Sequence, residues 1–154
     1  MPVIFDPSIL LDRLAIDYTG LFYAPADRIS PYEGLQTGES DRLMGATAHS
    51  VCDFLAQAGF VVLPDGGELP DHISVELTFM SELAHREAEA VEAGDSTIAA
   101  HAAALQRRFL AEHLGRWAGR FAGQVRDAAT TPFYRSMATL LAGFIADEQK
   151  LAPA

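Results

Sequence analysis

The sequence predicts an all-α fold, an irregular bundle of about six helices. Apolar residues recur at intervals of three and four over several long stretches, which is the spacing of one helical face. Proline at the first helical position marks the start of two of these stretches, at Asp6-Pro7 and at Thr131-Pro132. One strand-like run occurs, at residues 60–63, and no second run offers it a partner.

The first predicted helix spans about residues 6–23, and a loop follows over residues 24–40. The helix has one apolar face, formed by Leu10, Leu14, Tyr18, Leu21 and Phe22. The loop carries two prolines and two glycines. Because long loops in compact domains are often functional, Pro31-Tyr32-Glu33 in its middle is a candidate site. The alternative is that Tyr32 only pins the loop to the core.

A second helix is predicted to begin at Glu39 or Ser40 and to end at Gly59, since glycine terminates helices readily. Residues 60–63 are then expected to form an extended connector that packs inward. Residues 64–67 have the composition of a turn.

The central helix, predicted over residues 71–92, begins with the chemically richest part of the chain. Asp71 is expected to be its N-cap, because a carboxylate accepts hydrogen bonds from the free N–H groups of the first turn. His72 and Glu76 are four residues apart and are neighbours on one helical face. These residues form either a capped helix with a surface His–Glu pair, or a polar recognition site beside an apolar groove.

The C-terminal half is predicted to contain a bent helix and a final amphipathic helix. Asp95 is expected to cap a helix over residues 96–114, which bends at Gly115 and continues over residues 116–128. The bend is expected because apolar residues recur there at strict intervals of four, which drift around a helix of 3.6 residues per turn. The last helix begins at Pro132.

His113 is the one polar member of that apolar stripe, and Trp117 follows one turn later. A histidine on an apolar face is usually a hydrogen-bonded core residue, and a buried tryptophan needs a partner for its N–H. Alternatively, Asp71, His72, Glu76 and His113 could bind a divalent ion in a metal-dependent helical enzyme. The sequence contains neither a phosphate-binding loop nor a nucleophile elbow.

The charge balance points to basic partners. The 154 residues include 11 basic and 21 acidic ones, a formal net charge of −10, which disfavours nucleic acid and anionic membranes. A single cysteine excludes an intrachain disulfide and suits a reducing compartment. No apolar run reaches the length of a membrane span. The sequence thus predicts one cytoplasmic domain over residues 1–154, without a metal or other cofactor of its own.

Five short motifs follow one another along most of the chain. They are Tyr18-Thr19-Gly20-Leu21-Phe22; Pro31-Tyr32-Glu33; Pro70-Asp71-His72 with Glu76-Leu77-Thr78-Phe79-Met80; Phe109-Leu110 with His113-Leu114 and Trp117; and Pro132-Phe133-Tyr134. Each motif alone is weak, but five in this order are fairly specific. Together they resemble the TorD/DmsD/NarJ family of redox-enzyme maturation chaperones.

The resemblance implies a TorD-like, non-enzymatic chaperone dedicated to one molybdoenzyme. Such a chaperone binds the twin-arginine signal peptide, or another N-terminal part, of the apo form of a molybdopterin oxidoreductase catalytic subunit. It proofreads export of that subunit and favours insertion of the molybdenum cofactor. In the family, the segments that match Tyr32-Glu33 and Asp71-His72 with Glu76 are associated with partner binding.

The residues themselves are compatible with this function. The carboxylates of Glu33, Asp71 and Glu76 can accept bidentate hydrogen bonds from a guanidinium group. An apolar groove lined by large side chains would suit the apolar stretch of a signal peptide. The candidate partner-binding residues are Tyr32, Glu33, Asp71, His72, Glu76, Phe79, Met80, His113 and Trp117. A generic helical interaction domain is a further alternative, and it would show no preference for a twin-arginine peptide.

One departure from the family concerns the N-terminus. Family members usually carry an additional helical region before the segment that here starts at Asp6. We therefore expect either a homodimer that buries the face of Leu10, Leu14 and Tyr18, or a second chain that supplies the missing helices. A monomeric mass in solution at micromolar concentration would contradict the homodimer.

Overall fold

The computed structural model describes residues 7–39, 41–61 and 67–151, and the all-α prediction is confirmed there. Its elements in chain order are α1 (Pro7–Phe22), α2 (Glu33–Thr37), α3 (Ala46–Gln57), α4 (Ile73–Glu92), α5 (Ser96–Phe109), the π-helix η1 (Leu110–Leu114), α6 (Gly115–Ala128) and α7 (Pro132–Leu151). These residues form no β-strand, and their one isolated β-bridge joins Tyr32 to His72. No helix among them is long and apolar enough to cross a membrane.

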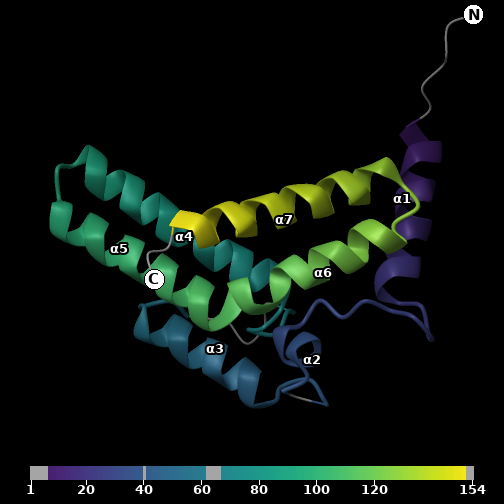
Figure 1. Cartoon of the computed structure of the whole chain (residues 1–154), viewed down its shortest axis with the longest axis horizontal. Coiled ribbons are helices and arrows are strands. Elements are labelled where there is room, and N and C mark those ends of the chain that lie inside the picture. Colours follow the sequence, from purple (N-terminus) through teal and green to yellow (C-terminus); the bar gives the residue numbers. More distant parts are fainter. Residues whose placement is uncertain (1–6, 40, 62–66, 152–154) are drawn as a thin grey trace, which may run out of the picture.

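The helices pack as two antiparallel pairs with smaller elements against them. α4 packs along α5, and α6 packs along α7 (Figure 1). α2 and α3 lie along the side of α5 and α6 that faces away from α7, and α1 stands across the end of the α6–α7 pair (Figure 1). The continuous α5–η1–α6 rod therefore takes part in both pairs.

The apolar stripe of this rod forms the centre of the core, as its spacing predicts. Phe109, Leu114 and Trp117 are fully buried. Phe109 belongs to a cluster with α3 and α4, in which its ring lies 4.7 Å from that of Phe79. Trp117 belongs to a second cluster with α1 and α7. Burial of such large side chains is the main favourable term that holds the bundle together.

The predicted bend lies one turn before Gly115. The five residues of η1 have π-helical hydrogen bonding, and α6 begins at Gly115. A Cβ atom on Gly115 would lie 2.4 Å from the carbonyl oxygen of Leu110. Such a contact is far inside van der Waals distance, so the close approach of the two turns requires glycine.

Several helix boundaries differ from the sequence prediction. α3 begins at Ala46, not at Glu39 or Ser40, and the predicted loop contains the short helix α2. α2 is too short to be stable by its own propensity, so tertiary contacts must hold it. α2 ends at Gly38, which has a φ of 74°. The expected turn at residues 64–67 lies mostly outside the described residues.

The ends of α4 and α7 show how distant residues complete helix termini. His72, not Asp71, is the N-cap of α4, and its Nδ1 accepts a hydrogen bond from the Ser74 N–H. At α7, the buried carboxylate of Asp17 in α1 accepts hydrogen bonds from the N–H groups of Thr130 and Thr131, at 2.9 and 2.8 Å. Burial opposes ionisation of Asp17, but these bonds and that of the Thr131 hydroxyl outweigh it and lower its pKa.

The apolar face predicted for α1 is only partly buried. Leu21 is buried, whereas Leu10 and Tyr18 are 41% and 44% exposed. Exposed apolar side chains of α7 include Phe133 and Met137. The homodimer through α1 stays a prediction.

Candidate functional site

Two of the predicted motifs meet in space. The segment around Tyr32 runs antiparallel to the segment around His72, and the two residues form the isolated β-bridge. The Glu33 N–H donates to the Asp71 carbonyl oxygen at 2.9 Å, and the Ile73 N–H donates to the Pro31 carbonyl oxygen at 2.9 Å. Because these bonds link the loop before α2 to the entry of α4, they fix the positions of both motifs.

The side chain of Asp71 strengthens this link. Its Oδ2 accepts a hydrogen bond from the Gly34 N–H at 3.2 Å. A carboxylate that receives the N–H of the first turn of α2 stabilises that helix, although it comes from a distant part of the chain. Asp71 is therefore a cap for α2 and not, as predicted, for its own helix.

Tyr32 and His72 form an accessible edge of the site together with Glu68. The two rings pack edge to face, with their centroids 5.0 Å apart. The Tyr32 hydroxyl donates to Glu68 Oε2 at 3.4 Å, and His72 Nε2 lies 3.7 Å from the same oxygen. Burial, more than the charge of Glu68, raises the pKa of Tyr32, and burial lowers the pKa of His72.

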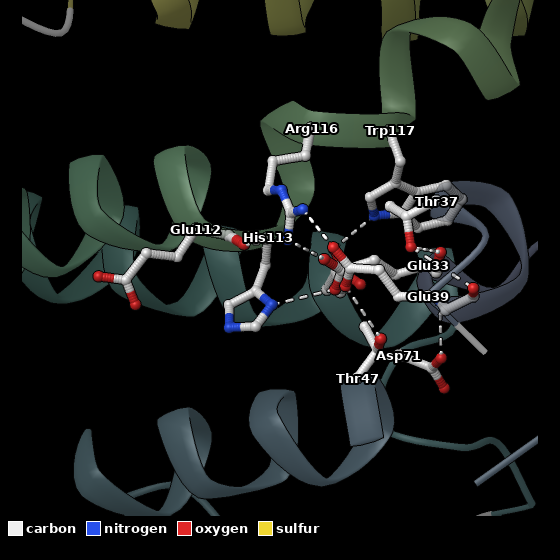
Figure 2. A network of polar contacts seen from close by, with 11 residues as sticks. Glu33, Thr37, Glu39, Thr47, Asp71, Glu112, His113, Arg116 and Trp117 are labelled. Atoms are coloured by element: carbon white, nitrogen blue, oxygen red, sulfur yellow. Dashed lines mark hydrogen bonds and ion pairs between the residues drawn. The ribbon is translucent and has the colours of Figure 1, made fainter. Parts of the chain in front are cut away.

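Beneath this edge lies a buried polar network that joins α2, α4, η1 and α6 (Figure 2). His113 Nδ1 lies 3.0 Å from Glu33 Oε2, within hydrogen-bond distance. The Trp117 indole N–H donates to Glu76 Oε2 at 3.1 Å. The side chains of Glu33 and Glu76 are completely buried, and those of Asp71 and His113 nearly so.

The network places carboxyl groups unusually close together inside the protein. Burial raises the pKa of Glu76 well above its usual range, and the charge of neighbouring Glu33 adds to the rise. The hydrogen bond from Trp117 acts in the opposite direction but is outweighed. One oxygen each of Glu33, Asp71 and Glu76 has no hydrogen-bond partner among the described residues. Such groups are costly to bury, so the network is a place where a ligand or a rearrangement would be favourable.

The structure thus brings the predicted polar residues together but turns most of them inward. Glu76 does not share a surface with His72, because it points into the bundle toward Trp117. Phe79, Met80 and Trp117 are core residues and do not line an open groove. The part of all the candidate residues in partner binding stays a prediction; among them, Tyr32 and His72 are partly exposed.

The accessible groove lies beside Tyr32 and His72. It is a cleft of about 360 Å³ between α1, the loop before α2 and the entry of α4. Its walls are mainly aromatic and apolar, and Arg28 and Glu68 supply charges of opposite sign. The aromatic residues of the wall are Tyr18, Phe22, Tyr23, Tyr32 and Phe121. Sequence reasoning missed Glu68, because its proximity to Tyr32 depends on the bridge between distant segments.

The alternative metal site has no geometric support. His72 faces Tyr32 and Glu68, whereas His113 pairs with Glu33 on the far side of the network. In the part of the chain that the structure describes, no three His, Cys, Asp or Glu side chains gather in a way that could hold a metal ion.

Comparison with known proteins identifies relatives over most of the chain. The nitrate reductase delta subunit family matches residues 7–123. The chain is 33% identical to "Chaperone protein TorD" of Shewanella loihica, over 88% of this chain and 60% of that protein. It is 31% identical to "Chaperone protein TorD" of Vibrio atlanticus, with 91% and 65% covered.

A third relative has a different name. The chain is 32% identical to "Chaperone protein YcdY" of Escherichia coli K12, over 84% of this chain and 60% of that protein. The chain therefore spans between 60% and 65% of the length of these three relatives. No solved structure gives a significant match. The match over residues 7–123 confirms the resemblance seen in the motifs: the chain belongs to the nitrate reductase delta subunit family, the TorD/NarJ family.

Proposed function

We propose that this chain is a chaperone for the maturation of a molybdoenzyme. It binds the N-terminal, twin-arginine signal region of the apo catalytic subunit in the cytoplasm, and it has no catalytic activity or cofactor of its own. Bound in this way, it delays export of the subunit until the molybdenum cofactor has been inserted. The names of the relatives support the chaperone role.

The observation that carries the proposal is the aromatic cleft beside Tyr32 and His72. Its volume of about 360 Å³ is enough for a few side chains of a peptide, and not for a folded domain. The apolar stretch of a signal peptide would bury its side chains against Phe22, Tyr23 and Phe121. The cleft therefore offers the apolar half of the recognition.

The polar half of the recognition begins at the rim of the cleft. The side chain of Glu68 is 48% exposed and already lies beside Tyr32 and His72. A guanidinium group that approached Glu68 could also stack on the Tyr32 ring, an arrangement that favours arginine over lysine. The net charge of −10 would speed the encounter with a basic segment.

We also propose that the exposed apolar side chains of α1 and α7 face a second copy of the chain. Leu10 and Tyr18 on α1 and Phe133 and Met137 on α7 are each between 41% and 50% exposed. Apolar side chains exposed together on neighbouring helices are typical of a covered surface. A monomeric mass in solution at micromolar concentration would contradict this proposal.

The cleft is tested by titration with the leader peptide of a molybdopterin oxidoreductase catalytic subunit from the same organism. Leu43 lines the cleft and is 49% exposed, so Leu43→Ser removes apolar contact area without opening the core. We expect binding to weaken by about tenfold, which corresponds to the loss of one partly buried apolar side chain.

The matched control is Ile98→Ser, on α5 and 53% exposed, which should leave the affinity unchanged. Equal affinities of both variants and the wild type would show that the peptide binds elsewhere. Absence of binding to the wild type would contradict the proposed function.

A further inference from the structure

A second, polar cavity opens on the other side of Glu33. It has a volume of about 240 Å³ and lies between the end of α2, the start of α3 and the junction of η1 with α6. Its charged and polar lining consists of Glu33, Glu39, Thr47, Ser50, Glu112, His113 and Arg116, most of which are visible in Figure 2. Apart from His113, the ionisable groups of the lining are three carboxylates and one guanidinium.

The guanidinium of Arg116 forms part of the wall of this cavity. It donates to Glu39 Oε1, and its Nη1 lies 3.4 Å from the backbone carbonyl oxygen of Glu112 (Figure 2). The bond and the charge of Arg116 lower the pKa of Glu39, and Glu39 in turn raises the pKa of Arg116. Thr47 holds the other oxygen of Glu39 through its hydroxyl, at 3.3 Å. The cavity is thus built to hold a guanidinium group.

Arg116 nevertheless does not complete the hydrogen bonding of Glu33, the most deeply buried carboxylate of the lining. Glu33 is completely buried and lines this cavity, and its Oε1 has no hydrogen bond from any described residue. The nearest nitrogen of Arg116 is 3.9 Å away, which is beyond hydrogen-bond distance. A guanidinium that entered the cavity slightly deeper would bond Glu33 Oε1 and Glu39 together. A donor there would be favourable, because a buried carboxylate oxygen without a hydrogen bond has lost its contact with water and gained no replacement.

We propose that this cavity is the receptor for an arginine side chain of the partner, and that Arg116 is an internal stand-in that the partner's arginine displaces. The source of that arginine rests on the proposed function, in which the partner is a twin-arginine segment. Arginine fits better than lysine because its planar fork can bond two carboxylates at once.

Displacement of Arg116 carries a low energetic cost. The side chains of Arg116 and Glu39 are each 44% exposed, and an ion pair so open to solvent is screened and contributes little to stability. The released Arg116 side chain can extend into solvent, where its charge is fully hydrated. Arg116 therefore keeps the cavity neutralised in the free chaperone and competes weakly with the partner.

The first test vacates the cavity and fills it with a small probe. We expect millimolar methylguanidinium to raise the thermal unfolding temperature of Arg116→Ala in a saturable way, and methylammonium at equal ionic strength to have no such effect. Arg116→Gln is a second vacating variant that retains more of the side-chain packing. Arg126→Ala is the matched control, because Arg126 forms a surface pair with Asp127, neither residue lines the cavity, and the variant should show no rescue.

The second test uses the leader peptide and a copy with both arginines changed to lysine. Arg116→Ala should bind the arginine peptide severalfold more tightly than the wild type does, up to about fivefold, and the lysine peptide equally. Glu39→Gln should abolish the difference between the two peptides. An unchanged or weakened affinity of Arg116→Ala for the arginine peptide would overturn displacement.

The two tests separate this inference from the proposed function. If methylguanidinium stabilises Arg116→Ala but no leader peptide binds any variant, the cavity is an arginine receptor and the signal peptide is the wrong source. If methylguanidinium stabilises neither vacating variant, the receptor is overturned, even where the leader peptide binds.

Discussion

Trp117→Ala is expected to lower the free energy of unfolding by about 3–5 kcal/mol, the usual cost of removing a fully buried aromatic side chain. Trp117 has no exposed surface and packs against Phe121, with ring centroids 5.5 Å apart. Its loss also leaves Glu76 without its hydrogen-bond donor. Chemical denaturation followed by circular dichroism measures the change.

A second variant at Trp117 separates the cost of lost packing from that of the lost hydrogen bond, and a variant at an exposed position is the control. Trp117→Phe keeps a ring but removes the N–H, so it should cost about 1–3 kcal/mol, the range for a buried polar group left unpaired. Val91→Ala removes an apolar side chain that is 65% exposed on α4 and should cost far less than Trp117→Ala. A cost of Trp117→Ala no larger than that of Val91→Ala would contradict the central place of Trp117 in the core.

The second large effect concerns the pH dependence of stability at Glu76. Because the pKa of Glu76 is raised in the folded state, the folded protein binds more protons than the unfolded chain at pH values above about 4.5, the ordinary value for this carboxyl group. The favourable contribution of neutral Glu76 to the free energy of unfolding is therefore fully present below that pH, and it is lost as the pH rises through the folded-state pKa.

Glu76→Gln should remove the decrease in stability that ionisation of Glu76 causes as the pH rises. The amide oxygen can still accept the hydrogen bond from Trp117, and the amide N–H can donate to the neighbouring carboxyl group of Glu33. We expect the variant to be more stable than the wild type near neutral pH by about 1–3 kcal/mol, the range for relieving one unsatisfied buried group. Its advantage should shrink as the pH falls to about 4.5.

The quantity to measure is the difference in free energy of unfolding between Glu76→Gln and the wild type at each pH. The lowered pKa values of Asp17 and Glu39 act in the opposite direction, since their contributions are lost as the pH falls, but they are common to both proteins and cancel. Glu82→Gln, on the exposed side of α4, is the control and should not change the profile. An advantage of Glu76→Gln that is constant with pH would show that Glu76 does not titrate as inferred.

Features that depend on neighbouring residues were predictable from the sequence. Proline at the first helical position marks the starts of α1 and α7 correctly, and Gly94 follows the last turn of α4 with a φ of 74°. The intervals of four between Leu105 and Val125 indicate a bend, and η1 provides it. These signals are local, because they arise from backbone geometry and helical periodicity.

Features that depend on distant residues were not predictable. α2 exists because Asp71, far away in the sequence, bonds to its first turn. Asp17 caps α7 across more than a hundred residues. The inward orientation of Glu76 could not be read from its spacing to His72, because the same helical spacing fits a buried and an exposed face. At the candidate site, the structure brings the motifs around Tyr32 and His72 together, and it adds Glu39, Glu68 and Arg116, which the motifs did not contain.

The most direct test is the affinity of this chain for the apo catalytic subunit of a molybdopterin oxidoreductase from the same organism, with and without its N-terminal signal region. Isothermal titration of both forms, in the absence of the molybdenum cofactor, gives the two dissociation constants. We predict binding to the complete subunit and loss of at least tenfold in affinity when the signal region is removed. Equal binding of both forms would contradict the claim that the cleft and the polar network recognise that region.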